Sequence, residues 1–440
     1  PAKANEQTFL HQLADGLRSA EEFQPPFGDR LKTGPLGALG PMYWEKDNSL
    51  DLEYHIRHSA LPKPGRYREL FALVARLHGT LLDRSRPLWE AHLIEGLQNR
   101  QFALYMKLHH ATTDGVGALQ IVKGMCSANK KARLNFSPLS MAAYQRLQQQ
   151  LPHRRERARP GKSDLTAVFD VLKQQFDSSL NLAGVVADYG KALVGLGGNL
   201  SMPWLNVPQT PISARISGSR RLVAHSWPMS RIKSLGEALD GTVNDVVLAM
   251  CSGALRTYLL AGQGLPKKSL KSLVPVSVRD AQDGGGGNAL SFITADLATN
   301  TRDPEKRFRA IQASVGAGKK LLDGLSASEA SLLWQLISAP SMITSLLGVT
   351  DRVPTFNLTI SNVPGSRKQL YWNRARLDGI YPVNIPFDGM AMSITLLSYR
   401  GMLDFGIIAC RRSVPRLQRM IDYMEAALIE LEEVAGISSA

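Results

Sequence analysis

Three cysteines are all that this chain of 440 residues contains, and several patterns typical of catalytic and metal sites are missing from it. Cys126, Cys251 and Cys410 are far apart and form no CxxC pair, which indicates a reducing compartment and free thiols packed in the core. HExxH is absent and no third ligand lies at a recognisable spacing, so we expect no metal site. The absence of GxSxG excludes the nucleophile elbow of a serine hydrolase.

Nucleotide-binding loops are missing as well. The glycine run Gly284–Gly287 precedes an expected strand and not a helix, which argues against a dinucleotide loop. The segment Gly316–Lys320 lacks the first glycine and the Ser/Thr of a P-loop. The chain also shows no secretory signal, which predicts a cytoplasmic protein.

Charge is sparse, at 20% of residues against 44% hydrophobic, which is typical of a globular protein. The net charge of +14 leaves three kinds of partner: nucleic acid, an anionic membrane or a phosphorylated substrate. The densest basic cluster, His153–Lys162, has no interleaved aromatics, so we expect no nucleic-acid binding. A solvated linker is an equally good interpretation of this cluster.

Residues Ala330–Thr350 contain no charged side chain, and their length approaches the ~20 residues of a membrane span. Pro340 lies at the centre, and several serines dilute the segment. We therefore predict two buried or interfacial helices that are broken at Pro340, and no span.

The most informative feature is the pattern HHxxxDG, formed by His109, His110, Asp114 and Gly115 directly after the alternating apolar run Phe102–Leu108. The alternation predicts a strand, so the histidines lie where a strand ends. A neutral imidazole can take a proton from a hydroxyl and later return it. The competing interpretation, two purely structural histidines, is weaker because the whole constellation is present.

The neighbours of His110 suggest supporting roles. Asp114 lies four residues later and is expected to brace the loop by pairing with an arginine, with a role as proton partner as the alternative. Gly115 is expected to supply a backbone conformation that other residues avoid. His109 is expected to support the loop, although a direct role stays open.

Four further segments accompany this pattern: Pro87-Leu88-Trp89-Glu90, Asn244-Asp245-Val246-Val247-Leu248, Pro275-Val276-Ser277-Val278-Arg279 and Ser361-Asn362-Val363-Pro364-Gly365. Together the five motifs resemble those of the bacterial wax ester synthase/diacylglycerol acyltransferase family, from about Phe9 to Glu433. Members usually carry a further segment ahead of this start, so the N-terminal strand of the family fold is expected to be missing.

The resemblance implies an α/β fold of two chloramphenicol acetyltransferase-like domains with the active site between them. It also implies transfer of a long-chain acyl group from acyl-CoA to a fatty alcohol or a diacylglycerol, with no permanently bound cofactor. His110 would act as general base in a direct transfer, and the uncharged stretch around Pro340 would wall a lipid tunnel. Peripheral binding to a membrane or lipid inclusion is expected from the apolar and basic surfaces.

Two alternatives stay open at this point. One is a sister acyltransferase with another alcohol or amine acceptor, and the other is a lipid-binding or droplet-coating protein without catalysis. Asn244 is expected near a helix start, where it either donates to a developing oxyanion or caps the helix, and Asp245 suits the helix dipole. Architectural roles are expected for Pro87, Leu88, Trp89, Asn362, Val363 and Pro364.

The length and the mixed periodicities predict two layered α/β domains. We expect an N-terminal domain over 1–135, a helical and basic crossover over 136–220 and a C-terminal domain over 221–440. Strands are expected at 89–95, 101–108, 222–227, 272–278, 289–298, 355–362, 391–399 and 403–410, and helices at 9–17, 70–77, 116–125, 165–180, 243–261, 304–321 and 415–433. The apolar segment 182–200 is expected to pack on a domain, with contact to lipid as the alternative.

Overall fold

The computed structural model describes residues 6–34, 42–134, 136–150, 190–191, 197–262, 264–277, 290–323 and 325–437. Several expectations fall outside these residues: the basic cluster 153–162, the helix at 165–180, most of the apolar segment 182–200, the run Gly284–Gly287, and Val278 with Arg279.

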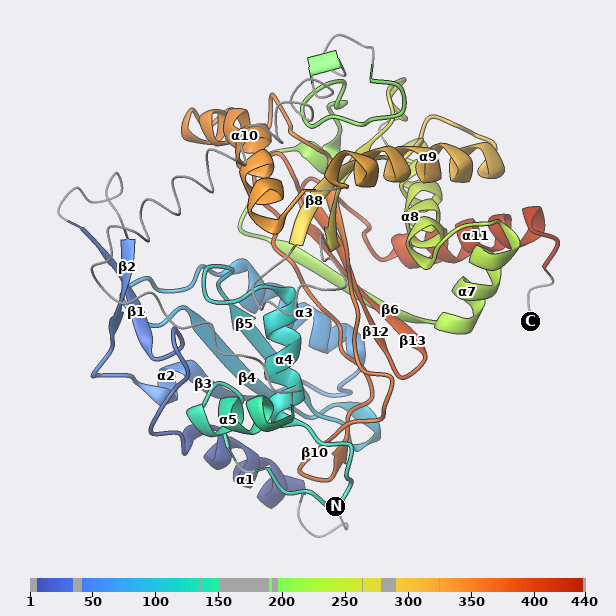
Figure 1. Cartoon of the computed structure of the whole chain (residues 1–440). Coiled ribbons are helices and arrows are strands. Elements are labelled where there is room, and N and C mark those ends of the chain that lie inside the picture. Colours follow the sequence, from blue (N-terminus) through green and yellow to red (C-terminus); the bar gives the residue numbers. More distant parts are fainter. Residues whose placement is uncertain are drawn as a thin grey trace.

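The first half of the chain carries a small sheet with strand order β3-β4-β5, in which β3 and β4 are parallel and β5 is antiparallel (Figure 1). A separate hairpin of β1 and β2 lies beside it. The elements are α1 (Glu6–Arg18), β1 (Asp29–Thr33), β2 (Met42–Lys46), α2 (Leu52–His55), β3 (Ile56–Ala60), α3 (Tyr67–Gly79), β4 (Trp89–Glu95), β5 (Ala103–Leu108), α4 (Gly115–Met125) and α5 (Met141–Gln150).

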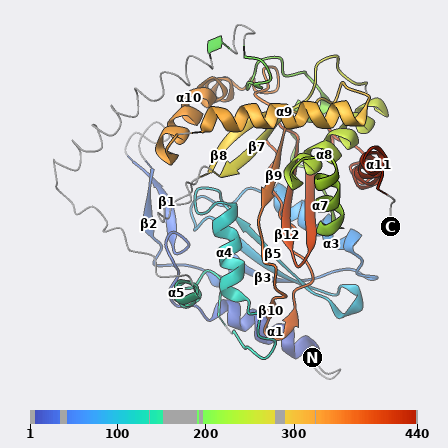
Figure 2. The same ribbon diagram turned by 45° about the vertical axis from the view of Figure 1, so that its right-hand side comes forward.

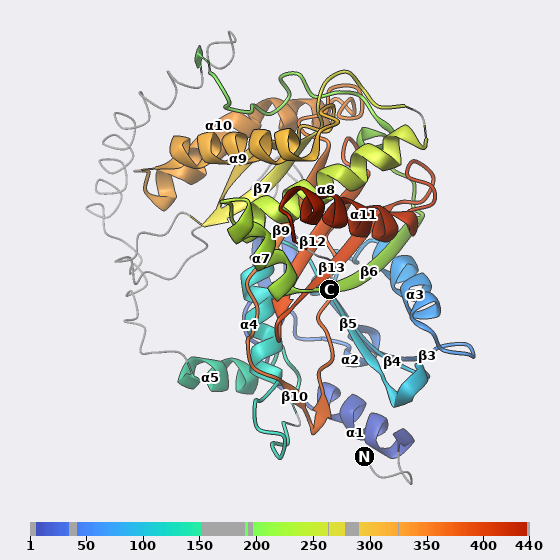
Figure 3. The same ribbon diagram turned by 90° about the vertical axis from the view of Figure 1, so that its right-hand side faces the viewer.

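The second half forms a six-stranded mixed sheet with strand order β6-β13-β12-β9-β7-β8. Figures 2 and 3 show α8, α9 and α11 grouped on this sheet. The elements are β6 (Arg220–Pro228), α7 (Met229–Ala238), α8 (Val243–Leu260), β7 (Lys271–Ser277), β8 (Leu290–Asp296), α9 (Pro304–Leu322), α10 (Ala327–Leu346), β9 (Leu358–Val363), β10 (Tyr371–Trp372), β11 (Ala375–Arg376), β12 (Met392–Tyr399), β13 (Met402–Cys410) and α11 (Arg419–Val434).

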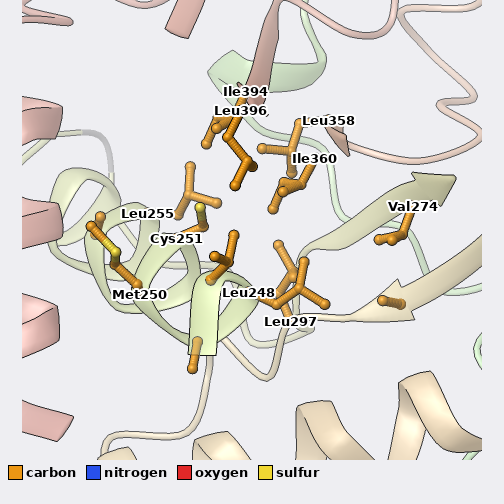
Figure 4. Packing of buried hydrophobic residues seen from close by; sticks show 14 of the residues in the cluster. Leu248, Met250, Cys251, Leu255, Val274, Leu297, Leu358, Ile360, Ile394 and Leu396 are labelled. Atoms are coloured by element: carbon orange, nitrogen blue, oxygen red, sulfur yellow. The ribbon is translucent and has the colours of Figure 1, made fainter. Parts of the chain in front are cut away.

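Alternation along the strands gives the second sheet two different faces. Ile360 of β9 and Ile394 of β12 are paired across the sheet and pack on α8, around Leu248 and Leu255 (Figure 4). Successive strand side chains point to opposite faces, so the neighbouring pair Ser361 and Thr395 points away from this core. The helix-covered face is therefore the hydrophobic core, and the opposite face is partly polar.

The two halves are joined by shared hydrophobic clusters. Leu70 and Val74 of α3 pack with Leu222 of β6 and Ile408 of β13. Trp372 of the small β10–β11 hairpin belongs to the core of the first half, together with Tyr399. The domain boundaries near 135 and 220 stay predictions, but the contacts show that the second half contributes directly to the core of the first.

The expectation of two helices broken at Pro340 is wrong, because α10 continues through this residue. Proline disrupts a helix chiefly by leaving carbonyls of the preceding turn without donors. Here the Trp204 indole donates to the Ile337 carbonyl at 3.1 Å, and the Ser338 hydroxyl donates to the Trp334 carbonyl at 2.7 Å. Side-chain donors thus bind two carbonyls of this turn, while the carbonyl that Pro340 itself leaves without a donor is that of Leu336. Within the residues described, none of the helices has the length and apolarity to traverse a bilayer.

Most expected elements are confirmed to within a few residues, and the three cysteines are buried and free. The mixed α/β fold class with two sheets is also confirmed. The periodicities did not predict β1, β2 and β3, the helices α2, α5 and α7, or the short hairpin of β10 and β11. Each of these elements has at most ten residues, which gives too few positions for a clear periodicity.

Candidate active site

The HHxxxDG segment forms a tight loop between the end of β5 and the start of α4. The His109 backbone N–H donates to the Leu88 carbonyl at 3.0 Å, which extends the pairing of β5 with β4 by one residue. The Thr112 N–H and hydroxyl both donate to the His109 carbonyl, at 2.8 and 2.6 Å. The loop is therefore held in one conformation by main-chain bonds.

His109 is a structural member of this loop. Its Nδ1 accepts a hydrogen bond from the Ala111 backbone N–H at 3.1 Å, so this nitrogen carries no proton. Burial lowers the pKa of His109, and the nearby charges of Arg84 and His110 lower it further. The ring is consequently neutral, with its proton on Nε2. The unprotonated nitrogen, Nδ1, is occupied by the Ala111 N–H and so cannot take a proton from a substrate.

His110 differs from His109 in its contacts. Both side chains are exposed and line the central cleft described below. Among the residues described, none donates to or accepts from its ring. The imidazole of His110 is therefore available for a molecule bound in the cleft.

Asp114 braces the loop by a different contact from the one expected. It is the N-cap of α4, and its Oδ1 accepts from the Gly117 backbone N–H at 2.7 Å. No arginine in the described part of the chain contacts the carboxylate, and Oδ2 is buried without a hydrogen-bond partner. The expected arginine is thus wrong, because the free N–H groups of a helix start bind the carboxylate instead.

The expected role of Gly115 is also wrong, because its φ is not positive. A Cβ on Gly115 would lie 3.6 Å from Val363 Cγ2 of β9, an ordinary contact distance, so the start of α4 lies beside β9 but the space does not require glycine. Gly117 was not among the expected site residues, but a Cβ there would lie 2.1 Å from Thr113 Oγ1. A second glycine in the first turn of a helix was the available signal, since glycine disfavours helix.

The HHxxxDG loop is anchored to the buried start of β4, at Pro87, Leu88 and Trp89. The indole N–H of buried Trp89 donates to the Phe27 carbonyl at 2.8 Å, and its ring packs on His55 at 4.5 Å between centroids. Leu88, which receives the His109 N–H, is 1% exposed. These contacts fit the architectural role expected of this segment.

A cleft of about 2480 Å³ lies between the two halves of the chain. The HHxxxDG loop forms part of one wall, and the end of β9 with Asn362, Val363 and Pro364 forms part of the opposite wall. Gly365 follows directly, and a Cβ there would lie 2.0 Å from the Ser398 carbonyl oxygen. The missing Cβ lets the chain after β9 pack against β12, where the Gly365 N–H donates to the Ser398 hydroxyl at 3.0 Å.

The wall that the second sheet presents to this cleft is polar near the loop and apolar farther along. Thr359, Ser361 and Thr395 line it, and Thr395 is 7% exposed with a hydroxyl that has no hydrogen-bond partner. An apolar end is formed by Leu273, Phe292, Trp334, Phe356 and Met390. Trp334 comes from α10, so the uncharged segment does wall the cleft.

A segment of the second half that lines the cleft is hydrogen-bonded to His78 of α3 in the first half. The segment from Tyr381 to Phe387 lines the cleft, and the Asn384 carbonyl accepts from His78 Nε2 at 3.0 Å. The other ring nitrogen, Nδ1, is 2.9 Å from the Tyr105 hydroxyl, which donates to it. Burial lowers the pKa of His78 to about 4, so the ring is neutral.

Asn244 does not line this cleft. It lies in the first turn of α8, and the helix cap is Thr242, so the alternative that Asn244 caps the helix is wrong. Asp245 completes the cap: its Oδ2 accepts from the Thr242 N–H and hydroxyl at 2.8 and 2.7 Å. A threonine one residue before the expected start provided the stronger cap, together with the carboxylate at the third helical position.

Comparison with known proteins agrees with this geometry. The wax ester synthase/diacylglycerol acyltransferase catalytic domain matches residues 1–247, and the WS/DGAT C-terminal domain matches residues 286–432. A probable diacylglycerol O-acyltransferase of Mycobacterium tuberculosis is 41% identical over 437 residues, which cover 98% of this chain and 92% of the relative. The O-acyltransferase WSD of Acinetobacter baylyi is 34% identical over 431 residues, or 97% of this chain and 90% of the relative.

The wax ester synthase/diacylglycerol acyltransferase from Marinobacter aquaeolei VT8 has a similar solved structure. Its TM-score to this chain is 0.74 at 37% identity, and the match covers 98% of this chain and 91% of that one. The resemblance drawn from the five short motifs is therefore confirmed over nearly the whole chain. This chain belongs to the wax ester synthase/diacylglycerol acyltransferase family and is an O-acyltransferase.

Proposed function

We propose that the protein transfers a long-chain acyl group from acyl-CoA to the hydroxyl of a fatty alcohol or a diacylglycerol, with His110 as the general base. One observation carries the proposal: an exposed imidazole with no protein partner and a wall of large apolar side chains share a single cleft. The cleft is large enough for a thioester and an acceptor to be bound together.

The proposed chemistry is balanced within one ternary complex. The unprotonated nitrogen of His110 takes the proton of the acceptor hydroxyl as its oxygen bonds to the thioester carbonyl carbon. The tetrahedral intermediate then breaks its C–S bond, and the imidazolium returns the proton to the leaving thiolate. No acyl-enzyme is required, and holding both substrates in one cleft supplies much of the acceleration.

Asp114 and His109 act as positioning residues in this scheme. Asp114 caps α4 and fixes the start of the helix, and His109 holds the loop through Ala111.

Thr395 is our candidate for stabilising the oxyanion, in place of Asn244. Its hydroxyl is buried and lines the cleft without a partner, and burial of an unsatisfied hydroxyl is costly unless a ligand binds it. It is paired across the sheet with Ser361, two residues before Val363, which approaches Gly115. A donor here would face the reacting carbonyl.

We further propose that the protein is cytoplasmic and binds membranes or lipid inclusions peripherally through the end of α10. Leu346 and Leu347 are 87% and 70% exposed, and Ile343 and Val353 beside them are 58% and 49% exposed. Exposed apolar side chains gathered at one helix end are typical of a surface that inserts into lipid. The same helix walls the apolar end of the cleft through Trp334.

The test is thiol release from palmitoyl-CoA by the wild type and His110→Ala, with hexadecanol or dioleoylglycerol as acceptor. We expect release that requires both an acceptor and His110. If neither hexadecanol nor dioleoylglycerol supports thiol release, an acyltransferase for another alcohol or amine is favoured. Binding of palmitoyl-CoA without release under any condition would favour a lipid-binding protein.

A further inference from the structure

Two segments that are far apart in the sequence together form a strongly basic corner of the molecule, comprising Lys130, Lys131, Arg133, Arg374 and Arg376. All five side chains are exposed, and residues 127–134 and 370–377 contain no acidic residue. The segments are bound to each other by backbone hydrogen bonds in both directions between Ser127 and Tyr371, at 2.9 and 2.8 Å. The backbone of the two segments is thus fixed in place by the fold.

Arg374 is held at the tip of the β10–β11 hairpin in an unusual backbone conformation. Asn373 and Arg374 form its two-residue turn, with φ of 46° and 71°. Glycine normally takes the second position of such a turn, because it adopts positive φ without strain. Asn373 is anchored by the Leu134 N–H, which donates to its Oδ1 at 2.5 Å. The chain therefore carries a cation where backbone preference favours glycine.

Lys130 and Arg374 are not neutralised by the protein. Neither forms an ion pair with an acidic residue of the described segments, whereas Arg376 is paired with Asp378 at 2.7 Å. Both Lys130 and Arg374 line the same cleft as His110. Two cations without an acidic partner among the described residues consequently line this end of the cleft.

The distance from His110 matches the length of a pantetheine arm. Residues along the whole of α4 line the cleft, from Gly115 through Val122 to Met125. This helix has 11 residues and spans about 16 Å. A pantetheine arm has two amide units and about a dozen bonds, so its extended length is about 15 Å by the reach of peptide-like chains. Figures 1 and 3 show β10 at one end of α4.

We propose that Lys130 and Arg374 bind the phosphates of acyl-CoA, with the pantetheine arm lying along α4 and the thioester at His110. This assignment rests on the proposed function and adds the position of the nucleotide. The phosphates carry several negative charges, which fits two unpaired cations that present charged hydrogen-bond donors. The cleft thereby separates into a nucleotide end at the hairpin and a lipid end at α10.

Three other cations that line the cleft fit this role less well. Lys107 Nζ donates to the Leu77 carbonyl at 3.0 Å and to the Thr80 carbonyl, and so caps the C-terminus of α3. Arg84 is close enough to His109 to lower its pKa, which is too near the reacting centre for the far end of CoA. Arg220 Nη1 donates to the Ser217 carbonyl.

The experiment compares two donors, palmitoyl-CoA and palmitoyl-pantetheine, which lacks the nucleotide and its phosphates. The variant is Lys130→Ala with Arg374→Gly, because glycine suits the backbone of the turn and preserves the hairpin. The control, Lys319→Ala with Lys320→Ala, removes the same charge from an exposed part of α9 outside the cleft.

For the double variant we expect the KM for palmitoyl-CoA to rise about tenfold or more, with kcat within about twofold, since lost phosphate contacts weaken binding without touching the reacting atoms. Palmitoyl-pantetheine should be used equally well by wild type and variant. An unchanged KM for palmitoyl-CoA, or an equal loss with both donors, would overturn the assignment while transfer by the wild type keeps the proposed function.

A wild type that transfers neither thioester would instead refute the proposed function. Calorimetric titration with adenosine 3′,5′-bisphosphate then decides the site by itself. Binding that is lost in the double variant but retained in the control supports the phosphate site, and equal binding by all three proteins contradicts it.

Discussion

The Ala111 N–H donates to His109 Nδ1 at 3.1 Å, and this one contact separates the roles of two adjacent histidines. The bond occupies Nδ1, the unprotonated nitrogen of His109. His110 is therefore the histidine of the pair whose ring is available to act on a substrate. Chemically identical side chains thus receive different roles from the backbone that carries them.

We expect His110→Ala to lower kcat by about 10²- to 10⁴-fold, the usual effect of removing a general base. The matched variant is His109→Asn, whose Oδ1 can accept from the Ala111 N–H, so it should keep activity within about tenfold of the wild type. Steady-state thiol release measures both. Equal losses in the two variants would contradict the division of roles.

Thr395→Val should lower kcat by about 10²-fold or more and leave the KM for palmitoyl-CoA nearly unchanged, because an oxyanion donor acts mainly in the transition state. Valine has nearly the same shape as threonine, so the buried site stays filled. Thr395→Ser restores the hydroxyl and should recover most of kcat. A Thr395→Val enzyme with normal kcat would exclude the hydroxyl from catalysis.

His78 predicts a loss of stability in mild acid. Its pKa in the folded protein is lowered to about 4, below the ordinary value of 6.5, so between these pH values the unfolded chain binds the proton more readily. The stabilisation is complete above about pH 6.5 and declines toward pH 4, by up to about 3 kcal/mol. Urea unfolding at pH 7.5 and 5 measures it.

His78→Gln retains a donor for the Asn384 carbonyl and does not titrate, so its free energy of unfolding should depend less on pH than that of the wild type. Since burial also lowers the pKa of His55, some pH dependence will persist in the variant. An identical dependence in both proteins would show that His78 is protonated as readily when folded as when unfolded.

Gly365→Ala should destabilise the fold by about 1 to 3 kcal/mol, since the added Cβ would lie 2.0 Å from the backbone oxygen of Ser398. Displacement of β9 should also reduce activity, because Val363 and Thr359 lie on that strand. Gly218→Ala is the control: nothing lies within 4 Å of a Cβ there, so thermal melting should show little change or a small gain.

The apolar end of α10 should govern binding to lipid. Leu346→Ser with Leu347→Ser should weaken binding to phosphatidylcholine/phosphatidylglycerol vesicles by about tenfold or more, since each buried leucine contributes about 1.5 kcal/mol or more. Leu260→Ser is the control, because Leu260 is 57% exposed at the end of α8. Vesicle co-flotation compares the three proteins, and equal flotation would place the lipid contact elsewhere.

Local patterns in the sequence were sufficient for most of the fold. The strand Trp89–Glu95 was predicted to the residue, and α4 was predicted to within one residue. Both depend on side-chain periodicity and on turn residues next to them, which are properties of adjacent positions. The same holds for the HHxxxDG loop, whose capping Asp114 and neighbouring glycines are all local.

Contacts between distant segments decided the rest. Pro340 lies within a continuous helix, and Trp204, from elsewhere in the chain, donates to a carbonyl of the preceding turn. Thr395 is an ordinary strand residue in the sequence, and it becomes a candidate catalytic group because the fold buries its hydroxyl in the cleft without a partner.

The sequence by itself therefore determined the family, the order of the elements and the loop that carries His110, since short motifs and periodicities act over a few residues. Only the tertiary structure decided which side chains meet in the cleft. Asn244 lies away from it, whereas Val363 approaches Gly115 and Lys130 joins Arg374. The reason is physical: these groups are neighbours only after hydrophobic burial has brought the two halves of the chain together.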